Sequence, residues 1–325
     1  MSEFERVPRS ERERDLLERA RQVLSSATRG PTPSRDYEMV VREARGSRIV
    51  DESGNSYIDF LLGSGPMLLG HAHPAVVRAV CDALERGSSY LLASEPAVEL
   101  AEEIVRATPC AEKVSFHCSG SEATFFALRL ARAFRRRDRI LKFEGGYNGQ
   151  GDAALMSNQW SRSFPPYPEP VPNSAGIPAS VRNDVLVAPF NDLDTAANLI
   201  EKHADELGGV IVEPMQRTIP PRPGFLAGLR EVTGRLEIPL IFDEVVTGFR
   251  FGYGSAQEYY GVQPDLCALG KSISAGLPLG VLAGRADIMV DPVLNAWDVA
   301  ALKPCVEGAG GRLTQVDGTP SDLGE

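Results

Sequence analysis

Helical and strand-like patterns of apolar residues alternate along the chain from about residue 75 onward. Apolar positions recur every three or four residues in five segments, which predicts helices at 75–85, 97–107, 121–136, 193–203 and 224–235. Short apolar runs between and after them predict strands at 113–117, 139–143, 184–188, 209–212, 239–242, 266–268 and 280–283. Strands mostly separated by helices indicate an α/β fold with an open, mostly parallel sheet that is covered on both faces.

The first 60 residues have a different pattern. Residues 9–25 predict a charged amphipathic helix, which a Gly-Pro-Thr-Pro run then breaks. Two short runs at 39–43 and 47–51 predict a hairpin, and residues 56–60 predict one more strand. Further along, the stretch 158–181 is rich in Pro and Ser and predicts a long loop, a feature that is often functional.

The composition of the chain limits which cellular compartment and which binding partners we expect. The chain has 325 residues, 43% of them hydrophobic and 24% charged, and its net charge is −10. This acidic balance argues against nucleic acid or an anionic membrane as the main partner. The five cysteines form no CxxC pair, which fits reduced thiols better than disulfides or a zinc site. Because neither a signal peptide nor a long apolar run is found, we expect a cytoplasmic protein.

One lysine lies in a setting where burial of its charge would cost free energy. Lys271 follows a predicted strand and Gly270, in a stretch with little other charge. A Schiff base with a carbonyl cofactor needs such an amine, held in a partly desolvated pocket with a lowered pKa. When this residue is considered alone, a surface lysine after a strand remains the alternative.

Small residues follow two other predicted strands. The run 118–123 precedes a helix, so its free backbone N–H groups could bind a phosphate, although Ser121 could equally be a simple helix cap. The run 143–149 places two glycines before Tyr147, whose ring could lie against a flat heterocycle. A plain glycine-rich turn is the alternative there.

Carboxylates follow two further apolar strands. Asp243 and Glu244 end one of them, and Glu213 ends another. A carboxylate buried there needs a cation or hydrogen-bond donors, and a protonated ring nitrogen of a cofactor would suit Asp243. Glu213 is expected to support the pocket. Because no cluster of His and Cys accompanies these carboxylates, we do not expect a metal. All these polar runs lie at strand ends, where ligands bind in such sheets.

In their order and position, these runs resemble the class III (fold type I) pyridoxal-phosphate aminotransferases, in particular the branch with glutamate-1-semialdehyde aminomutase. The resemblance covers roughly residues 35–288 and rests on the runs 65–74, 119–124, 143–147, 172–178, 188–192, 223–226, 242–250 and 269–271. It implies a fold type I large domain, pyridoxal 5′-phosphate as cofactor and a homodimer. It also implies small-molecule substrates, namely an amino donor and a keto acid or aldehyde acceptor.

The resemblance also assigns catalytic and substrate roles. Lys271 would form the Schiff base with the cofactor and move the proton during transfer. Asp243 would pair with the pyridine nitrogen. Arg35 falls where the aminomutases bind the substrate carboxylate.

The remaining implied roles concern the cofactor. Gly120 and Ser121 would bind its phosphate, Tyr147 would stack on one face of its ring, and Val245 would pack on the other face.

Two departures from the family pattern bear on the activity. Asn148 stands where a histidine is usual, and the run 213–217 is shorter than the aminomutase version and lacks its asparagine. These differences favour a general ω- or β-amino-acid aminotransferase over a strict aminomutase.

The tail resembles another family. Class III members continue after the lysine into a small C-terminal domain, whereas the run 295–311 is similar to the C-terminal end of an inositol-monophosphatase-like sugar phosphatase. The Trp-Asp motif of that family supplies a metal ligand, which would be Asp298 here. A single Asp without the other ligands cannot hold a Mg²⁺ pair, so phosphatase activity is not expected.

We therefore expect three parts: an N-terminal helix with small-domain strands at 1–60, a cofactor-binding large domain at 61–288, and a phosphatase-like tail at 289–325. The small domain of the family would be incomplete or replaced. The expected function is pyridoxal-phosphate-dependent transfer of an amino group. The alternatives are a glutamate-1-semialdehyde-type aminomutase and a non-catalytic chain that binds the cofactor without turnover.

Overall fold

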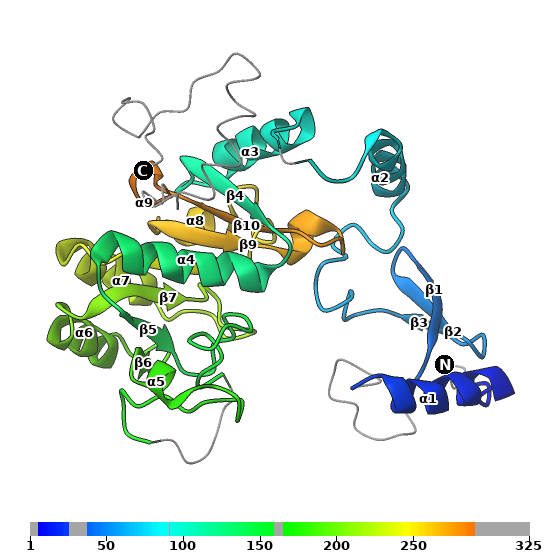
Figure 1. The fold of residues 1–325 in the computed structure, drawn as a ribbon, viewed down its shortest axis with the longest axis horizontal. Helices are drawn as coiled ribbons and strands as arrows, with labels where there is room; N and C mark the ends of the chain where they lie inside the picture. Colours follow the sequence, from blue (N-terminus) through cyan, green and yellow to red (C-terminus); the bar gives the residue numbers. More distant parts are fainter. Residues whose placement is uncertain (1–5, 26–37, 91, 159–164, 290–325) are drawn as a thin grey trace, which may run out of the picture.

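A computed structural model describes residues 6–25, 38–90, 92–158 and 165–289 of the chain (Figure 1). Its N-terminal part extends away from the main body and comprises α1 (Glu11–Val23), β1 (Val41–Arg45), β2 (Arg48–Asp51), β3 (Ser56–Ile58) and α2 (Pro74–Arg86). Strands β1, β2 and β3 form an antiparallel sheet of their own. Ser10 begins α1 because its side chain accepts a hydrogen bond from the Glu13 N–H at 3.1 Å.

The main body is built on a seven-stranded sheet with the order β4-β10-β9-β8-β7-β5-β6. Its strands are β4 (Lys113–His117), β5 (Arg139–Phe143), β6 (Val185–Ala188), β7 (Leu207–Val212), β8 (Leu240–Glu244), β9 (Leu266–Leu269) and β10 (Gly280–Gly284). Neighbouring strands from β9 to β6 are parallel, while β10 runs antiparallel to both β4 and β9. The expectation of a mostly parallel sheet is confirmed.

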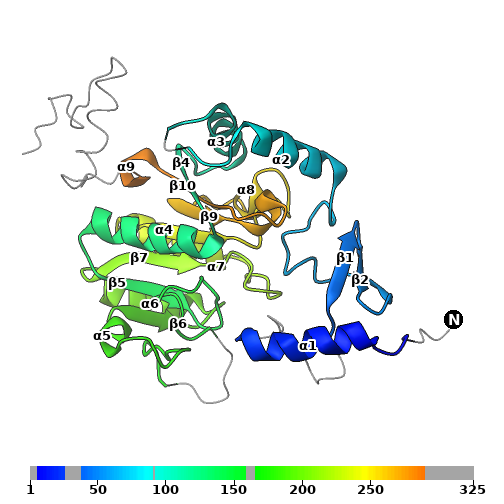
Figure 2. The ribbon, with the colours of Figure 1, turned by 45° about the vertical axis from the view of Figure 1, so that its right-hand side comes forward.

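Helices cover both faces of this sheet (Figure 2). They are α3 (Glu95–Ala107), α4 (Gly120–Arg135), α5 (Ala179–Arg182), α6 (Leu193–Lys202), α7 (Phe225–Arg235), α8 (Ser255–Tyr260) and α9 (Ala286–Met289), with the short 3-10 helix η2 at Lys271–Ser274. The five helices predicted from residue 75 onward are all present, with ends displaced by two residues at most. The short helices α5, α8, α9 and η2 were not predicted, since so few residues show no periodicity.

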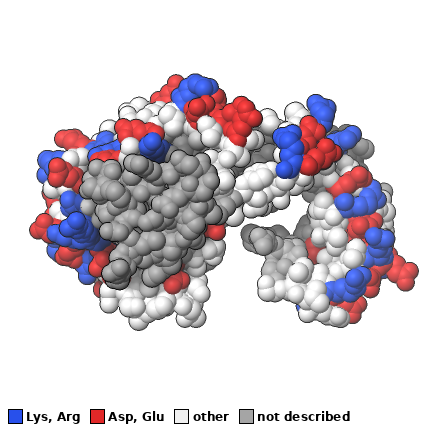
Figure 3. Space-filling model, turned by 45° about the horizontal axis from the view of Figure 1, so that its top comes forward, with Lys and Arg blue, Asp and Glu red and all other residues white. Residues whose placement is uncertain are grey.

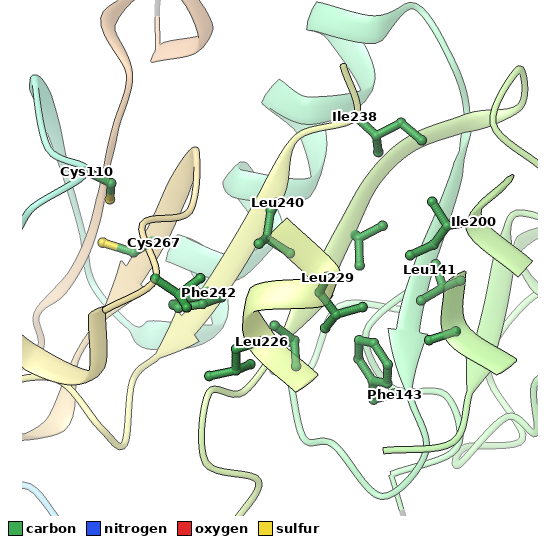
Figure 4. Packing of buried hydrophobic residues seen from close by; sticks show 14 of the residues in the cluster. Cys110, Leu141, Phe143, Ile200, Leu226, Leu229, Ile238, Leu240, Phe242 and Cys267 are labelled. Carbon is green, nitrogen blue, oxygen red and sulfur yellow. The ribbon is translucent and has the colours of Figure 1, made fainter. Parts of the chain in front are cut away.

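Alternate residues of the strands pack into two separate cores. Ile140, Ile211 and Ile241 belong to a cluster with the alanines of α4, whereas Leu141 and Phe242 belong to a second cluster with α6 and α7. Figure 4 shows this second cluster, in which the leucines of α7 lie against the side chains of β5 and β8. This alternation follows from strand geometry, since successive side chains point to opposite faces. It places the central strands of the sheet between two apolar layers.

The surface carries both signs of charge. Figure 3 shows Lys and Arg interspersed with Asp and Glu over the face in view. No helix in the described part of the chain is long and apolar enough to cross a membrane.

Candidate active site

A cavity of about 490 Å³ lies at the carboxyl ends of the sheet strands. All six residues predicted to bind the cofactor line it: Gly120, Ser121, Tyr147, Asp243, Val245 and Lys271. They come from four different segments, each of which follows or ends a strand, and the sheet order brings these segments together. The other two predicted ligand residues, Arg35 and Asp298, lie outside the described residues.

Lys271 begins the 3-10 helix that follows β9. Its backbone is in the left-handed region at φ +44°, an uncommon conformation for a lysine that often marks functional sites. The side chain is half-buried, and this burial lowers the pKa of Lys271, while the nearby carboxylates of Asp243 and Glu213 oppose the shift. A lowered pKa increases the fraction of neutral amine, which is the form that attacks a carbonyl.

Asp243 is buried near the end of β8. Its Oδ2 accepts a hydrogen bond from Asn148 Nδ2 at 2.9 Å, and its Oδ1 accepts one from the Val245 N–H at 3.2 Å. Burial raises the pKa of Asp243, and the two hydrogen bonds and the charges of Lys271 and Lys142 counteract it only in part. A carboxylate can accept about four hydrogen bonds, so this one retains capacity for a further donor from the cavity.

The adjacent Glu244 faces a different environment. It is fully buried and accepts hydrogen bonds from Thr247 Oγ1, the Ala256 N–H and Gln257 Nε2, at 2.8 to 2.9 Å. Glu244 therefore ties β8 to α8, and only Asp243 of this pair lines the cavity.

The first turn of α4 forms one wall of the cavity. Ser119 caps the helix, since its Oγ accepts a hydrogen bond from the Glu122 N–H at 3.2 Å. The N–H groups of Gly120 and Ser121 have no acceptor within the described part of the protein, and they point the positive end of the helix dipole toward an anion. A Cβ at Gly120 would lie 2.8 Å from both methyl groups of Val245, so only glycine fits there.

Glu213 holds the turn that carries Tyr147. Its Oε1 accepts a hydrogen bond from the Tyr147 N–H at 2.6 Å, and its Oε2 accepts one from the Arg217 N–H at 3.2 Å. Burial, together with the nearby Asp243 carboxylate, raises the pKa of Glu213 to about 7. The phenol of Tyr147 in turn accepts a hydrogen bond from Gln150 Nε2 at 2.6 Å. These contacts agree with the supporting role predicted for Glu213.

Lys142 is a residue that the sequence interpretation missed. It lies within β5 and is fully buried, and its Nζ donates hydrogen bonds to the backbone carbonyls of Gly146 at 3.0 Å, Ala154 at 2.7 Å and Met156. All three acceptors belong to the loop that contains Tyr147 and Asn148. Burial lowers the pKa of Lys142 to about 7, with the charges of Glu213 and Asp243 in opposition. The signal in the sequence was a charged residue inside an otherwise apolar strand.

The described residues contain no group of His, Cys, Asp and Glu that could hold a metal ion. His71 pairs with Asp59, with 2.7 Å between Nε2 and Oδ2.

A free helix N-terminus, a half-buried lysine and a buried aspartate around one cavity of a mostly parallel sheet define a site that fits pyridoxal 5′-phosphate. The chain belongs to the aminotransferase class-III family, whose sequence profile matches residues 31–295. Pyridoxal 5′-phosphate is the cofactor of that family. Among curated relatives, glutamate-1-semialdehyde 2,1-aminomutase of Methanothermobacter thermautotrophicus is 43% identical over 289 residues, which are 87% of this chain and 67% of that protein.

Solved structures agree with the family. An omega-transaminase from Sphaerobacter thermophilus superposes with a TM-score of 0.82 at 39% identity, covering 88% of this chain and 66% of that one. A glutamate-1-semialdehyde aminomutase from Pseudomonas aeruginosa, in complex with PMP, gives a TM-score of 0.74 at 28% identity, with 90% and 63% covered. The chain thus spans about two thirds of the length of the relatives it matches.

Proposed function

We propose that this chain binds pyridoxal 5′-phosphate at Lys271 and transfers an amino group between an amino acid or amine and a keto acid or aldehyde. The observation that carries the proposal is the convergence of Lys271, Asp243 and the free N–H groups of α4 on one cavity. Bound pyridoxal phosphate supplies an electron sink for the bonds at the α-carbon of the donor.

The residues of the chain would divide the remaining work. The amine of Lys271 would attach the cofactor and afterwards take and return the α-proton of the donor, a role suited to a lowered pKa. Asp243 would accept a hydrogen bond from the ring nitrogen and keep it protonated, and Asn148 would hold Asp243 in position. Tyr147 and Val245 would cover the ring and exclude water.

The test is cofactor loading followed by a half-reaction. The full chain, incubated with pyridoxal phosphate, should acquire visible absorbance, and borohydride reduction with peptide mapping should place the cofactor on Lys271. Lys271→Ala should give neither signal. A panel of amines should then convert the bound cofactor to pyridoxamine phosphate. A colourless protein would contradict the proposal, and loading without conversion by any amine would support the non-catalytic alternative.

An aminomutase is the second candidate, because the curated relatives carry that name. The departures within 213–217 favour the transaminase instead. Incubation with glutamate-1-semialdehyde separates the two activities. An aminomutase should return the isomer with the amino group on the neighbouring carbon and should need no keto acid. A transaminase should require a keto acid and release its amino form.

A homodimer is also part of the proposal, and its support is an exposed apolar surface on the segment between β3 and α2. Phe60 is 90% exposed, Leu61 71% and Leu69 59%, and a second copy of the chain would cover them. Light scattering of the cofactor-loaded protein should give twice the chain mass, and a Phe60→Asp substitution should shift it toward the monomer. A wild-type monomer at all concentrations would contradict this part.

We further propose a cytoplasmic location, supported by four free cysteines, Cys81, Cys110, Cys118 and Cys267, in the described residues. The division into 1–60, 61–288 and 289–325 is likewise proposed. Its support is that β1, β2 and β3 form a sheet separate from the main one.

A further inference from the structure

Arg217 occupies a strained position in the cavity wall. Gln216 and Ile219 exchange two backbone hydrogen bonds, at 3.0 and 2.9 Å, which close a tight turn with Arg217 as its first central residue. The φ angle of Arg217 is +55°, in the left-handed region, which has a conformational cost for any residue other than glycine. Glycine would fit the turn without this cost. A side chain retained in a strained turn beside a cavity points to a use for that side chain.

Two hydrogen bonds hold the guanidinium of Arg217 in place and leave part of its donor capacity unused. Nε donates to the carbonyl of Gly145 at 3.1 Å, and Nη2 donates to the carbonyl of Asn158 at 2.9 Å. Nη1 has no acceptor among the residues that the structure describes, and the side chain is exposed to the cavity. Two anchored nitrogens restrict the rotamers of a long side chain, so little conformational entropy remains to be lost when a ligand binds.

The charges around the cavity identify the ligand class. Of the described residues that line it, only Lys271 and Arg217 are cationic, while Asp243 and Glu213 are acidic. Lys271 serves the cofactor in the proposed function. Among the described residues that line the cavity, Arg217 is therefore the cation left for a substrate carboxylate, and its planar guanidinium matches a carboxylate.

We propose that Arg217 binds the carboxylate of the amino donor, so that the enzyme prefers amino acids to amines without a carboxylate. The inference rests on the proposed function and narrows its substrate class. It makes Arg217 a substrate-binding residue at a position where the turn geometry favours glycine.

The test compares matched pairs of donors, each an amino acid and the amine that lacks its carboxylate, in the half-reaction of the cofactor-loaded full chain. A charge-assisted hydrogen bond contributes about 1.5–3 kcal/mol, so Arg217→Gln should lower kcat/KM for the amino acid about 10- to 100-fold more than for the amine. In Arg217→Lys, the preference in kcat/KM for the amino acid over the amine should lie between those of the wild type and Arg217→Gln. Arg222→Gln, an exposed arginine that does not line the cavity, serves as the matched control and should not change the ratio.

A second measurement separates this inference from the proposed function. Calorimetry with glutarate, a carboxylate without an amine, should show binding to the wild type and about 10-fold or greater weakening in Arg217→Gln. Equal binding by both proteins, or none by the wild type, would overturn the inference. An equal loss of kcat/KM in Arg217→Gln for amino acids and for amines would also overturn the inference, since removal of a purely structural arginine would affect both kinds of donor equally. Glutarate binding that depends on Arg217 in a chain without turnover would leave the inference standing and count against catalysis alone.

Discussion

Gly280 offers a sharp test of how the sheet positions the predicted phosphate site. It begins β10, opposite His117 of β4, and its backbone lies against the turn before α4. A Cβ added at Gly280 would lie 2.1 Å from the Ser119 carbonyl oxygen and 2.9 Å from the Gly120 nitrogen. Ordinary contacts begin at 3.4 Å, so the turn must move by about 1 Å in Gly280→Ala, an overpacking that costs about 1–3 kcal/mol.

That displacement falls on the N–H groups expected to bind the phosphate. Misaligning one or two charge-assisted hydrogen bonds costs about 1.5–3 kcal/mol, so Gly280→Ala should raise the Kd for pyridoxal phosphate about 10- to 100-fold. Absorbance titration measures the Kd, and denaturant unfolding of the cofactor-free protein checks that the variant still folds cooperatively. Gly176→Ala is the control, because its Cβ would meet only Ser174 Oγ at 3.8 Å. A folded Gly280→Ala protein with the wild-type Kd would refute this reasoning.

Three further predictions concern charged or polar contacts. Asn148→Leu removes the Nδ2 group that donates a hydrogen bond to Asp243, so kcat should fall about 10- to 100-fold. Asn148→His restores a donor and should recover part of the lost kcat. Equal losses of kcat in the two variants, measured by steady-state kinetics, would contradict the positioning role of Asn148. Burial lowers the pKa of Lys142 to about 7, far below its unfolded value, so the unfolded chain binds more protons between about pH 7 and pH 10. The unfolding free energy of the wild type relative to Lys142→Met should therefore rise across this range in denaturant titrations, and a flat difference would count against the lowered pKa of Lys142. Burial would raise the pKa of Asp265, but hydrogen bonds from Leu240 and two arginines outweigh it and lower the pKa. Asp265→Asn should therefore cost about 1.5–3 kcal/mol of stability at neutral pH, a loss that shrinks below about pH 4, and a pH-independent loss would argue against the ion pairs.

The sheet and most of the cavity could be predicted because both depend on local signals. Each buried strand is a short apolar run with polar residues or glycine at its carboxyl end, and parallel strands bring those ends to one edge. The antiparallel direction of β10 also had a signal that went unused. Only residues 270–279 connect β9 to β10, fewer than the dozen or so that a parallel crossover needs.

The interactions that sequence interpretation missed are contacts between distant segments. Lys142 is satisfied by carbonyls from a loop whose path depends on the whole fold, and the pair Asn148 and Asp243 joins residues 95 positions apart. Arg217 was hidden for another reason. Its turn has the geometry that glycine favours but contains no glycine, so composition gives no sign of it.

The electrostatics of the cavity show why folding and cofactor binding should respond differently to pH. Burial raises the pKa of Asp243 and Glu213 and lowers the pKa of Lys142 and Lys271, so all four groups are biased toward their neutral forms. Lys142 already has three acceptors, and its titration therefore belongs to folding. Asp243 has only two donors, and a protonated ring nitrogen would supply the missing one and stabilise the carboxylate. Binding of the cofactor should thus depend on the protonation of Asp243, whereas the stability of the empty fold should depend on that of Lys142.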